Sequence, residues 1–292
     1  MTEQLAGERA QTAPGAGAAA RHATVVQDLA DETAALRAVL ADLPDADWEL
    51  PTPAQDWAIR DQVSHLAYFD GAAVRSVRDP DGFAAEIAAM MAGTPLPGRS
   101  GRAEEFRDMS APELLAWSDT ARAELLECFG GLHPRDRVIW YGPSMSAKSM
   151  VTARLMETWA HGTDVLDAVG APSRPSSRLR HVAHIGIAAR GFAFRTNGQP
   201  VPTEPVRVEL DPQVPDETTW EWGPVDAADR VTGTALDFCL LVTQRRHRAD
   251  TALVAQGPVA DAWLDLAQAF AGPPGAGRAP DFDRWWGDAR GR

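Results

Sequence analysis

Three residues of the chain, His65, Glu157 and His161, have types and a spacing that could hold a metal ion. Glu157 and His161 are four positions apart in a stretch that reads as one helix from residue 146 to about 169, so both side chains point the same way. His65 lies in a second helical run. If the two helices pack side by side, two imidazoles and one carboxylate converge and leave coordination positions open, as in a catalytic metal site. The spacing alone also fits a solvated glutamate beside a histidine in the core.

His65, Glu157 and His161 lie in the first part of the chain, where the sequence pattern predicts helices. Hydrophobic residues recur with helical spacing from Ala23 to Leu43, and Pro44 ends that run. The pattern Ser110-Ala-Pro-Glu113 is a capping box, which satisfies backbone donors at the beginning of a helix. The long helices are predicted at 23–43, from about 59 through His65, at 110–129 and at 146–169. Four such helices predict a bundle, a fold that often holds metals on inward-facing side chains.

The second half of the chain has a different character. A Pro/Ser-rich segment at 172–177 indicates a linker, and period-two alternation then predicts short strands at 206–210, 219–222 and 229–233. Helices are expected through 181–188, 235–242 and 259–270. The predicted fold class is therefore α+β, a four-helix bundle with a smaller C-terminal α+β domain. The predicted divisions are a disordered tail at 1–22, the bundle at 23–172, the C-terminal domain at 173–275 and a tail at 276–292.

Composition narrows the classes of partner. The 292 residues are 45% hydrophobic and carry a formal net charge of −13, so a core can form, and nucleic acid and anionic membranes are disfavoured as partners. No apolar run is long enough to span a membrane, and no secretion or transit signal is recognisable. Cys128 and Cys239 have apolar neighbours and no paired spacing, which indicates core residues in a reducing compartment. We expect a cytoplasmic protein, a monomer or a homodimer.

Two motifs together resemble a known family. The stretch Thr52-Pro-Ala-Gln-Asp-Trp-Ala-Ile-Arg-Asp-Gln-Val-Ser-His65-Leu66, with Glu157-Thr-Trp-Ala-His161-Gly-Thr-Asp164, resembles the DinB-like superfamily. More closely, it is similar to the mycothiol-dependent maleylpyruvate isomerase branch of actinobacteria, and the segment 231–241 is similar to the strand-to-helix motif near the C-terminus of that family. The resemblance implies a metal-binding bundle in which His65, Glu157 and His161 are the ligands. The segments 238–248 and 267–278 depart from the pattern and indicate a distinct subgroup, so the metal chemistry transfers more safely than the substrate.

A site of this kind can activate either a water or a thiol. The resemblance favours the thiol of mycothiol, held by a divalent metal, with zinc expected before iron, manganese, cobalt or nickel. Attack on a small electrophile then leads to isomerisation if the thiol leaves and to S-conjugation if it stays, and conjugation is the expectation. A hydrolase using a metal-bound water, a non-catalytic metal- or small-ligand-binding protein and a non-haem iron oxygenase are the alternatives.

Residues around the triad could complete the site. Asp61 and Asp164 are each within about one turn of a candidate ligand histidine and could orient it, although a carboxylate on the helix surface is the simpler interpretation of both. Trp57 and Tyr141 are candidates to line a substrate pocket, with ordinary packing for Trp57 and surface exposure for Tyr141 as the other interpretations.

Charged side chains in the second half have two interpretations as well. Arg245 and Arg246 could bind an anionic group of the substrate, or they could simply neutralise the end of a helix. His181 and His184, three positions apart, could form a second metal site, but no third ligand is evident nearby in the sequence.

Overall fold

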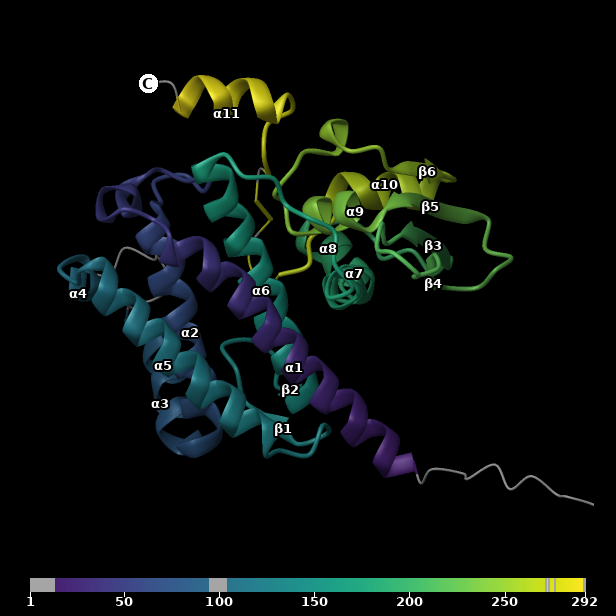
Figure 1. The fold of residues 1–292 in the computed structure, drawn as a ribbon. Coiled ribbons are helices and arrows are strands. Elements are labelled where there is room, and N and C mark those ends of the chain that lie inside the picture. Colours follow the sequence, from purple (N-terminus) through teal and green to yellow (C-terminus); the bar gives the residue numbers. More distant parts are fainter. Residues whose placement is uncertain (1–13, 95–103, 271, 273, 276, 291–292) are drawn as a thin grey trace, which may run out of the picture.

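The structure is a computed structural model that describes residues 14–94, 104–270, 272, 274, 275 and 277–290. Four long helices form the first part of the molecule (Figure 1). They are α1 (Pro14–Ala41), α2 (Ile59–Arg78), α5 (Ala111–Gly130) and α6 (Ala147–Val169). Helix α6 packs against α1 and α2, and α5 packs against the same two helices on the other side, which confirms the predicted bundle. None of the described helices combines the length and apolar character needed to cross a membrane.

Side chains at the ends of the helices fix where they begin and stop. The backbone N–H of Ala58 donates to Asp61 at 2.7 Å at the beginning of α2, and that of Ser110 donates to Glu113 at 2.7 Å before α5, as the capping-box pattern predicts. Helix α6 ends at Gly170, whose φ of 73° is the left-handed conformation that glycine adopts without strain. The remaining elements before α6 are short. They are η1 (Asp45–Glu49), α3 (Pro80–Met91), α4 (Glu104–Arg107), β1 (Arg137–Val138) and β2 (Met145–Ser146).

The second part is built around a four-stranded mixed sheet, so the predicted α+β class is confirmed. Its strands are β3 (Val206–Asp211), β4 (Trp220–Trp222), β5 (Asp229–Thr234) and β6 (Val254–Gln256) in the order β4-β3-β5-β6. Strands β3 and β5 are parallel, and the edge strands β4 and β6 are antiparallel to their neighbours. Strand β6 was not predicted. The associated helices are α7 (Leu179–Ala188), α8 (Arg190–Thr196), α9 (Ala235–Val242), η3 (Arg248–Asp250) and α10 (Pro258–Leu266).

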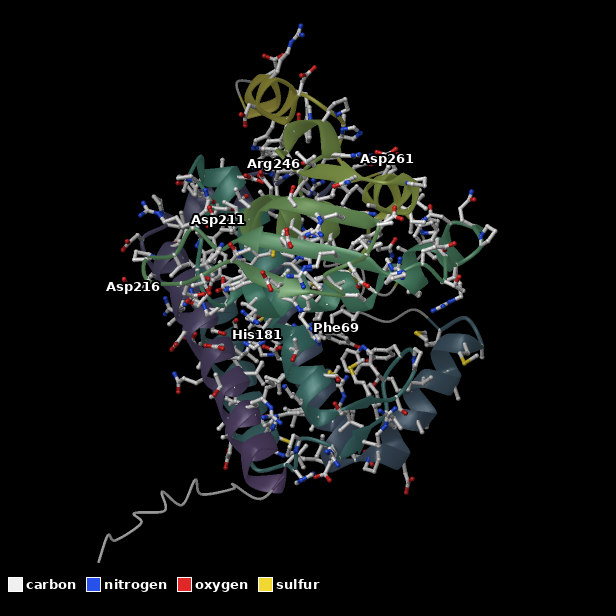
Figure 2. All side chains as sticks on the ribbon, turned by 90° about the vertical axis from the view of Figure 1, so that its right-hand side faces the viewer. Phe69, His181, Asp211, Asp216, Arg246 and Asp261 are labelled. Carbon is white, nitrogen blue, oxygen red and sulfur yellow. The ribbon has the colours of Figure 1, made fainter. Side chains whose placement is uncertain are left out.

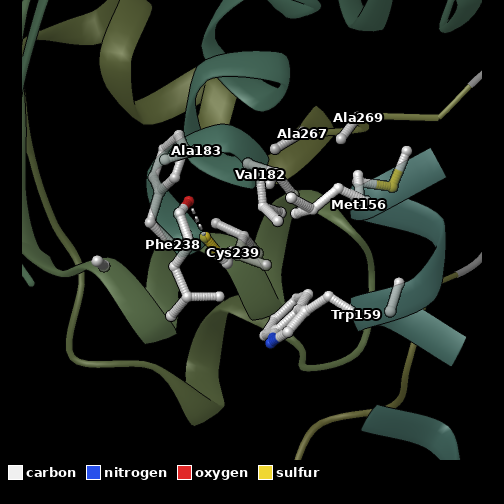
Figure 3. Packing of buried hydrophobic residues seen from close by; sticks show 14 of the residues in the cluster. Met156, Trp159, Val182, Ala183, Phe238, Cys239, Ala267 and Ala269 are labelled. Atoms are coloured by element: carbon white, nitrogen blue, oxygen red, sulfur yellow. Dashed lines mark hydrogen bonds between the residues drawn. The ribbon is translucent and has the colours of Figure 1, made fainter. Parts of the chain in front are cut away.

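The two parts share one buried core. Met156 and Trp159 of α6 lie in the same buried hydrophobic cluster as Val182 of α7 and Phe238 of α9 (Figure 3). Cys239 of α9 lies among them, and its thiol donates to the carbonyl oxygen of Leu179 at 3.4 Å. Burial raises the pKa of this thiol well above its usual value, so Cys239 is a packing residue rather than a nucleophile.

Residues of both predicted tails belong to helices. Residues 1–13 lie outside the described part of the chain, but residues 14–22 belong to α1, so the predicted tail is wrong for them. His22 is buried and bonds the carbonyl oxygen of Phe129 at 2.7 Å, which ties the first turns of α1 to α5. At the other end, α11 (Phe282–Arg290) is a helix, and its Trp286 is buried and donates to the carbonyl oxygen of Asp167 at 3.0 Å. Two buried aromatic residues of α11, Phe282 and Trp286, therefore make this end a docked element of the fold.

Candidate metal centre

The three residues predicted to bind a metal come together between α2 and α6. One ligand atom each of His65, Glu157 and His161 lies within 4.8 Å of the other two. Nε2 of His161 is 3.2 Å from a carboxylate oxygen of Glu157, and the two imidazole centroids are 4.5 Å apart. Within the described part of the chain, this is the only set of three or more His, Cys, Asp or Glu side chains that could hold a metal ion. The packing of α2 against α6 thus produces the convergence that the helical spacing suggested.

Gln62 of α2, which is not among the predicted site residues, orients the ring of His161. The Thr52 hydroxyl donates to the carbonyl oxygen of Trp57 at 2.9 Å, so the Thr52 oxygen must accept the 2.8 Å bond from the amide nitrogen of Gln62. The amide oxygen of Gln62 then faces Nδ1 of His161, which has to donate to it. Nε2 of His161 is therefore the nitrogen that faces Glu157 and is open to a metal.

The electrostatics of the three residues fit a divalent cation. Burial raises the pKa of Glu157, but the hydrogen bond and charge of His161, together with the charges of Arg154 and His65, outweigh it and lower the pKa to about 2. The carboxylate is thus ionised at neutral pH. Nδ1 of His161 is bonded to Gln62, so Nε2 can meet that carboxylate, 3.2 Å away, either as a second N–H donor or through a metal ion bound between the two atoms. Two imidazoles and one carboxylate are the donor set of many catalytic divalent metals.

Trp57, a predicted pocket wall, lies directly against the rings of His65 and His161. Its ring stacks on that of His161 at 5.8 Å and 17°, and its centroid is 5.2 Å from that of His65. A short loop holds it there, because a bridge pairs Pro51 with Ala58 and the loop folds back on itself between them. The indole thus covers one side of both imidazoles.

Tyr141 lies one aromatic ring away from the triad. Its ring is 5.8 Å from that of Phe69, which in turn is 4.7 Å from His65. The Tyr141 hydroxyl donates to Glu86, and Tyr68 donates to the same carboxylate oxygen at 3.4 Å. Burial and the hydrogen bond to Glu86 raise the pKa of Tyr141, so the hydroxyl stays protonated. Contact of Tyr141 with a substrate stays a prediction.

The two aspartates predicted to orient the ligands have other contacts. Asp61 accepts the N–H of Ala58 at the beginning of α2, and its orientation of His65 stays a prediction. Asp164 is fully buried, and its two oxygens accept from Arg245 and Arg278, each at 2.8 Å. The bond to His161 comes instead from Gln62.

Arg245 and Arg246 join the C-terminal part to α6. Arg245 pairs with Asp164 at 2.8 Å, and Arg246 forms two hydrogen bonds with Asp167 at 2.7 and 2.9 Å. Arg246 also lies 3.5 Å from the ring centroid of Phe282 in α11, on the side of the molecule shown in Figure 2. Both guanidinium groups therefore have structural partners, and their contact with an anionic substrate stays a prediction.

The predicted second histidine site has a different arrangement. His181 pairs with Asp28 of α1 at 2.7 Å, which attaches α7 to the bundle. Neither His181 nor His184 belongs to a set of three potential ligands among the residues that the structure describes.

Comparison with protein families gives two matches. The model of the mycothiol maleylpyruvate isomerase N-terminal domain matches residues 29–166, a range that includes all three triad residues. A model described as wyosine base formation matches residues 215–256.

Curated relatives and solved structures were also found. Two uncharacterized proteins, from two strains of Mycobacterium tuberculosis, are each 46% identical over 253 residues, covering 87% of this chain and 97% of theirs. Crystal structures of the mycothiol-dependent maleylpyruvate isomerase and of a histidine-to-alanine mutant of it share the fold with TM-scores of 0.51, covering 82% of this chain and 95% of theirs. Their sequence identities are 17% and 16%, so the likeness concerns the fold alone.

Proposed function

Since this chain belongs to the DinB-like family of mycothiol maleylpyruvate isomerase-type proteins, we propose that it is an enzyme dependent on a divalent metal and on mycothiol. The observation that carries the proposal is the convergence of His65, Glu157 and His161 within 4.8 Å, inside the region that the family model matches. The substrate is proposed to be a small electrophile, and maleylpyruvate is not assigned to this chain.

Some residues of the site would hold the metal ion, and others would orient or cover those residues. His65, Glu157 and His161 would hold the ion, for which zinc is the first choice. When bound, such a metal lowers the pKa of a coordinated thiol, about 8.5 when free, and so supplies a thiolate near neutral pH. Gln62 keeps the proton of His161 on Nδ1 and so presents Nε2 to the ion. Trp57 covers one side of both imidazoles and excludes water there.

The proposed reaction is addition of the thiol sulfur to an electrophilic carbon. When that carbon belongs to a double bond conjugated with a carbonyl group, a carbon–sulfur bond forms and the electron pair moves to the carbonyl oxygen. Rotation about the resulting single bond and expulsion of the thiolate give isomerisation. Protonation of the adduct instead gives a stable conjugate, and conjugation is the outcome that we propose.

The test is metal content by mass spectrometry, with a matched histidine control. Wild-type protein should bind about one equivalent of zinc, the His161→Ala variant should lose it, and the His184→Ala variant, outside the triad, should keep it. Purified wild type that stays metal-free after reconstitution would contradict the proposal.

Electrophile consumption with and without mycothiol then separates the remaining alternatives. Turnover that needs both metal and thiol supports the proposal. Turnover without thiol would indicate a metal-dependent hydrolase, and metal binding without turnover would indicate a binding protein.

A further inference from the structure

Arg278 differs from the other two arginines at the C-terminal end of α6, because it reaches a second element. Arg245 and Arg246 pair with aspartates of α6 and with carbonyl oxygens of their own segment. Arg278 donates through one terminal nitrogen to Asp164 at 2.8 Å and through the other to the carbonyl oxygen of Pro53. The planar guanidinium group has several donors and can bond two acceptors at once. Arg278 therefore joins α6 to the loop before α2.

The loop from Thr52 to Trp57 is closed by its own hydrogen bonds. The carbonyl oxygen of Trp57 accepts from the backbone N–H of Thr52 at 2.7 Å and from its hydroxyl at 2.9 Å. The N–H of Trp57 donates to the carbonyl oxygen of Ala54 at 3.0 Å. These bonds fix the shape of the loop, so a contact at Pro53 also sets the position of the Trp57 indole, which stacks on His161.

The backbone that follows Arg278 is anchored to the C-terminal part. Asp250 accepts the N–H of Asp281 at 2.9 Å and that of Phe282 at 3.3 Å. The Arg278 side chain itself is only 14% exposed, and its partner Asp164 is fully buried. The guanidinium group thus holds the loop from a segment whose own position is fixed.

We propose that Arg278 is a positioning residue of the candidate metal centre. It fixes the loop against α6 and so keeps the indole of Trp57 on the imidazole of His161. His161 lies three positions before Asp164, so the guanidinium group bridges the two elements on either side of this ring. The matched family model ends at residue 166, so the site depends on a segment outside that domain. The inference rests on the proposed function for the metal alone.

The first test uses hydrogen–deuterium exchange of the full-length, metal-free protein, measured by mass spectrometry. Local opening of a loop exposes its backbone N–H groups to exchange. In the Arg278→Ala variant, peptides covering residues 51–58 should exchange about tenfold faster, as expected for the loss of one hydrogen bond from a charged donor. The variant should fold, because Asp164 keeps its bond to Arg245.

Arg245→Ala is the matched control. Its side chain is also 14% exposed and pairs with the same buried carboxylate at the same distance of 2.8 Å. This variant loses a comparable ion pair but leaves the contact between Arg278 and Pro53, so exchange at 51–58 should stay as in the wild type. Equal acceleration in both variants, or none in Arg278→Ala, would overturn the inference.

The second test measures the rate of zinc release to excess chelator in a double-mutant cycle. Arg278→Ala should release zinc about tenfold faster, the lower end of the effects of groups that act on a metal through its ligands. If Arg278 acts through Trp57, adding Arg278→Ala to a Trp57→Leu variant should not accelerate release further. Additive effects would show that Arg278 acts by another route and would contradict the inference.

The two proposals can fail separately. A wild-type protein that binds no zinc would contradict the proposed function, while exchange at 51–58 in the metal-free protein would still decide whether Arg278 positions the loop. Normal zinc binding with unchanged exchange and release in Arg278→Ala would overturn the role of Arg278 alone.

Discussion

Helix α6 carries two charged clusters of opposite character within three turns. At its C-terminal end, Asp164 and Asp167 are each matched by guanidinium groups from the C-terminal part of the chain. One turn earlier, Glu157 and His161 lie beside His65, with one potential ligand atom of each within 4.8 Å of the others. The first cluster is complete in itself and joins two parts of the fold. The second is a set of three side chains that could hold a metal ion, and we propose that it is completed by one.

A third charged cluster is buried inside the bundle. Asp70 of α2 accepts from Arg122 of α5 at 2.7 Å and from Arg154 of α6 at 2.9 Å, and all three side chains are buried. Arg122 also donates to Thr33 of α1 and to Thr158. This network touches all four long helices, so we expect it to determine stability rather than chemistry.

The Asp70→Asn substitution should have the largest effect on the fold. It leaves two buried guanidinium groups without their carboxylate, and breaking a buried pair in this way typically costs about 3–5 kcal/mol. The free energy of unfolding from urea denaturation should fall by that amount in metal-free protein. A loss below about 1 kcal/mol would show that this network does not determine the stability of the bundle.

The Glu157→Gln substitution should affect metal binding more than the stability of the fold. It removes an anionic ligand, so zinc affinity should fall by about 1,000-fold, or about 4 kcal/mol, more than the loss of a group that only orients a ligand. The unfolding free energy of the metal-free protein should fall by less, about 1–3 kcal/mol, because the charges of His161, Arg154 and His65 that lower the pKa of Glu157 lose their partner. A competition titration with a chromophoric chelator measures the affinity, and an unchanged value would remove Glu157 from the site.

Asp164→Asn should lower the free energy of unfolding by about 2–3 kcal/mol. The reason is that two hydrogen bonds between charged groups, which join α6 to the C-terminal part, become weaker ones. Burial raises the pKa of Asp164, but the charges of Arg245 and Arg278 outweigh it and hold that pKa below its usual 3.8. Such a carboxylate stabilises the fold fully above its unfolded pKa, and the contribution is lost as the pH falls through the lower folded value. The stability difference between wild type and variant should therefore be constant above about pH 5 and narrow below pH 4. A difference that widens in acid would contradict this sign.

The sequence predicted what depends on local spacing. Two potential ligands on one face of a helix and the capping box at Ser110 follow from helical geometry alone, and the structure has both arrangements. The Gly- and Pro-rich composition after Phe270 gave no sign that α11 docks through Phe282 and Trp286, because that contact depends on the path of the chain. Likewise, the Ala-rich segment before residue 23 has good helix formers but lacks the apolar periodicity on which the prediction relied.

The partners of Asp164 and His161 depend on how separate elements meet. Arg278 is more than a hundred residues from Asp164, and it also donates to the carbonyl oxygen of Pro53 in the loop that carries Trp57. Spacing along one helix cannot predict such a contact. Gln62 did leave a signal, since it is a polar residue on the buried face of α2, next to Ile59 and Val63.

Gln62→Leu should have the smallest effect of these substitutions. It tests whether a residue that only orients His161 contributes less to zinc affinity than a residue that binds the metal. Leucine fills a similar volume but cannot accept the proton on Nδ1 of His161, so the imidazole loses its fixed tautomer and direction. Groups that orient metal ligands are typically worth about 10–100-fold in affinity, so zinc binding should weaken by that factor and persist. Gln62→Glu is the informative counterpart, because its carboxylate accepts the same proton and should retain most of the affinity. If the leucine variant binds zinc as tightly as the wild type, the ring of His161 is held by Trp57 packing alone. If the leucine variant loses as much zinc affinity as Glu157→Gln, the hydrogen bond from His161 to Gln62 is as important for binding as a metal ligand.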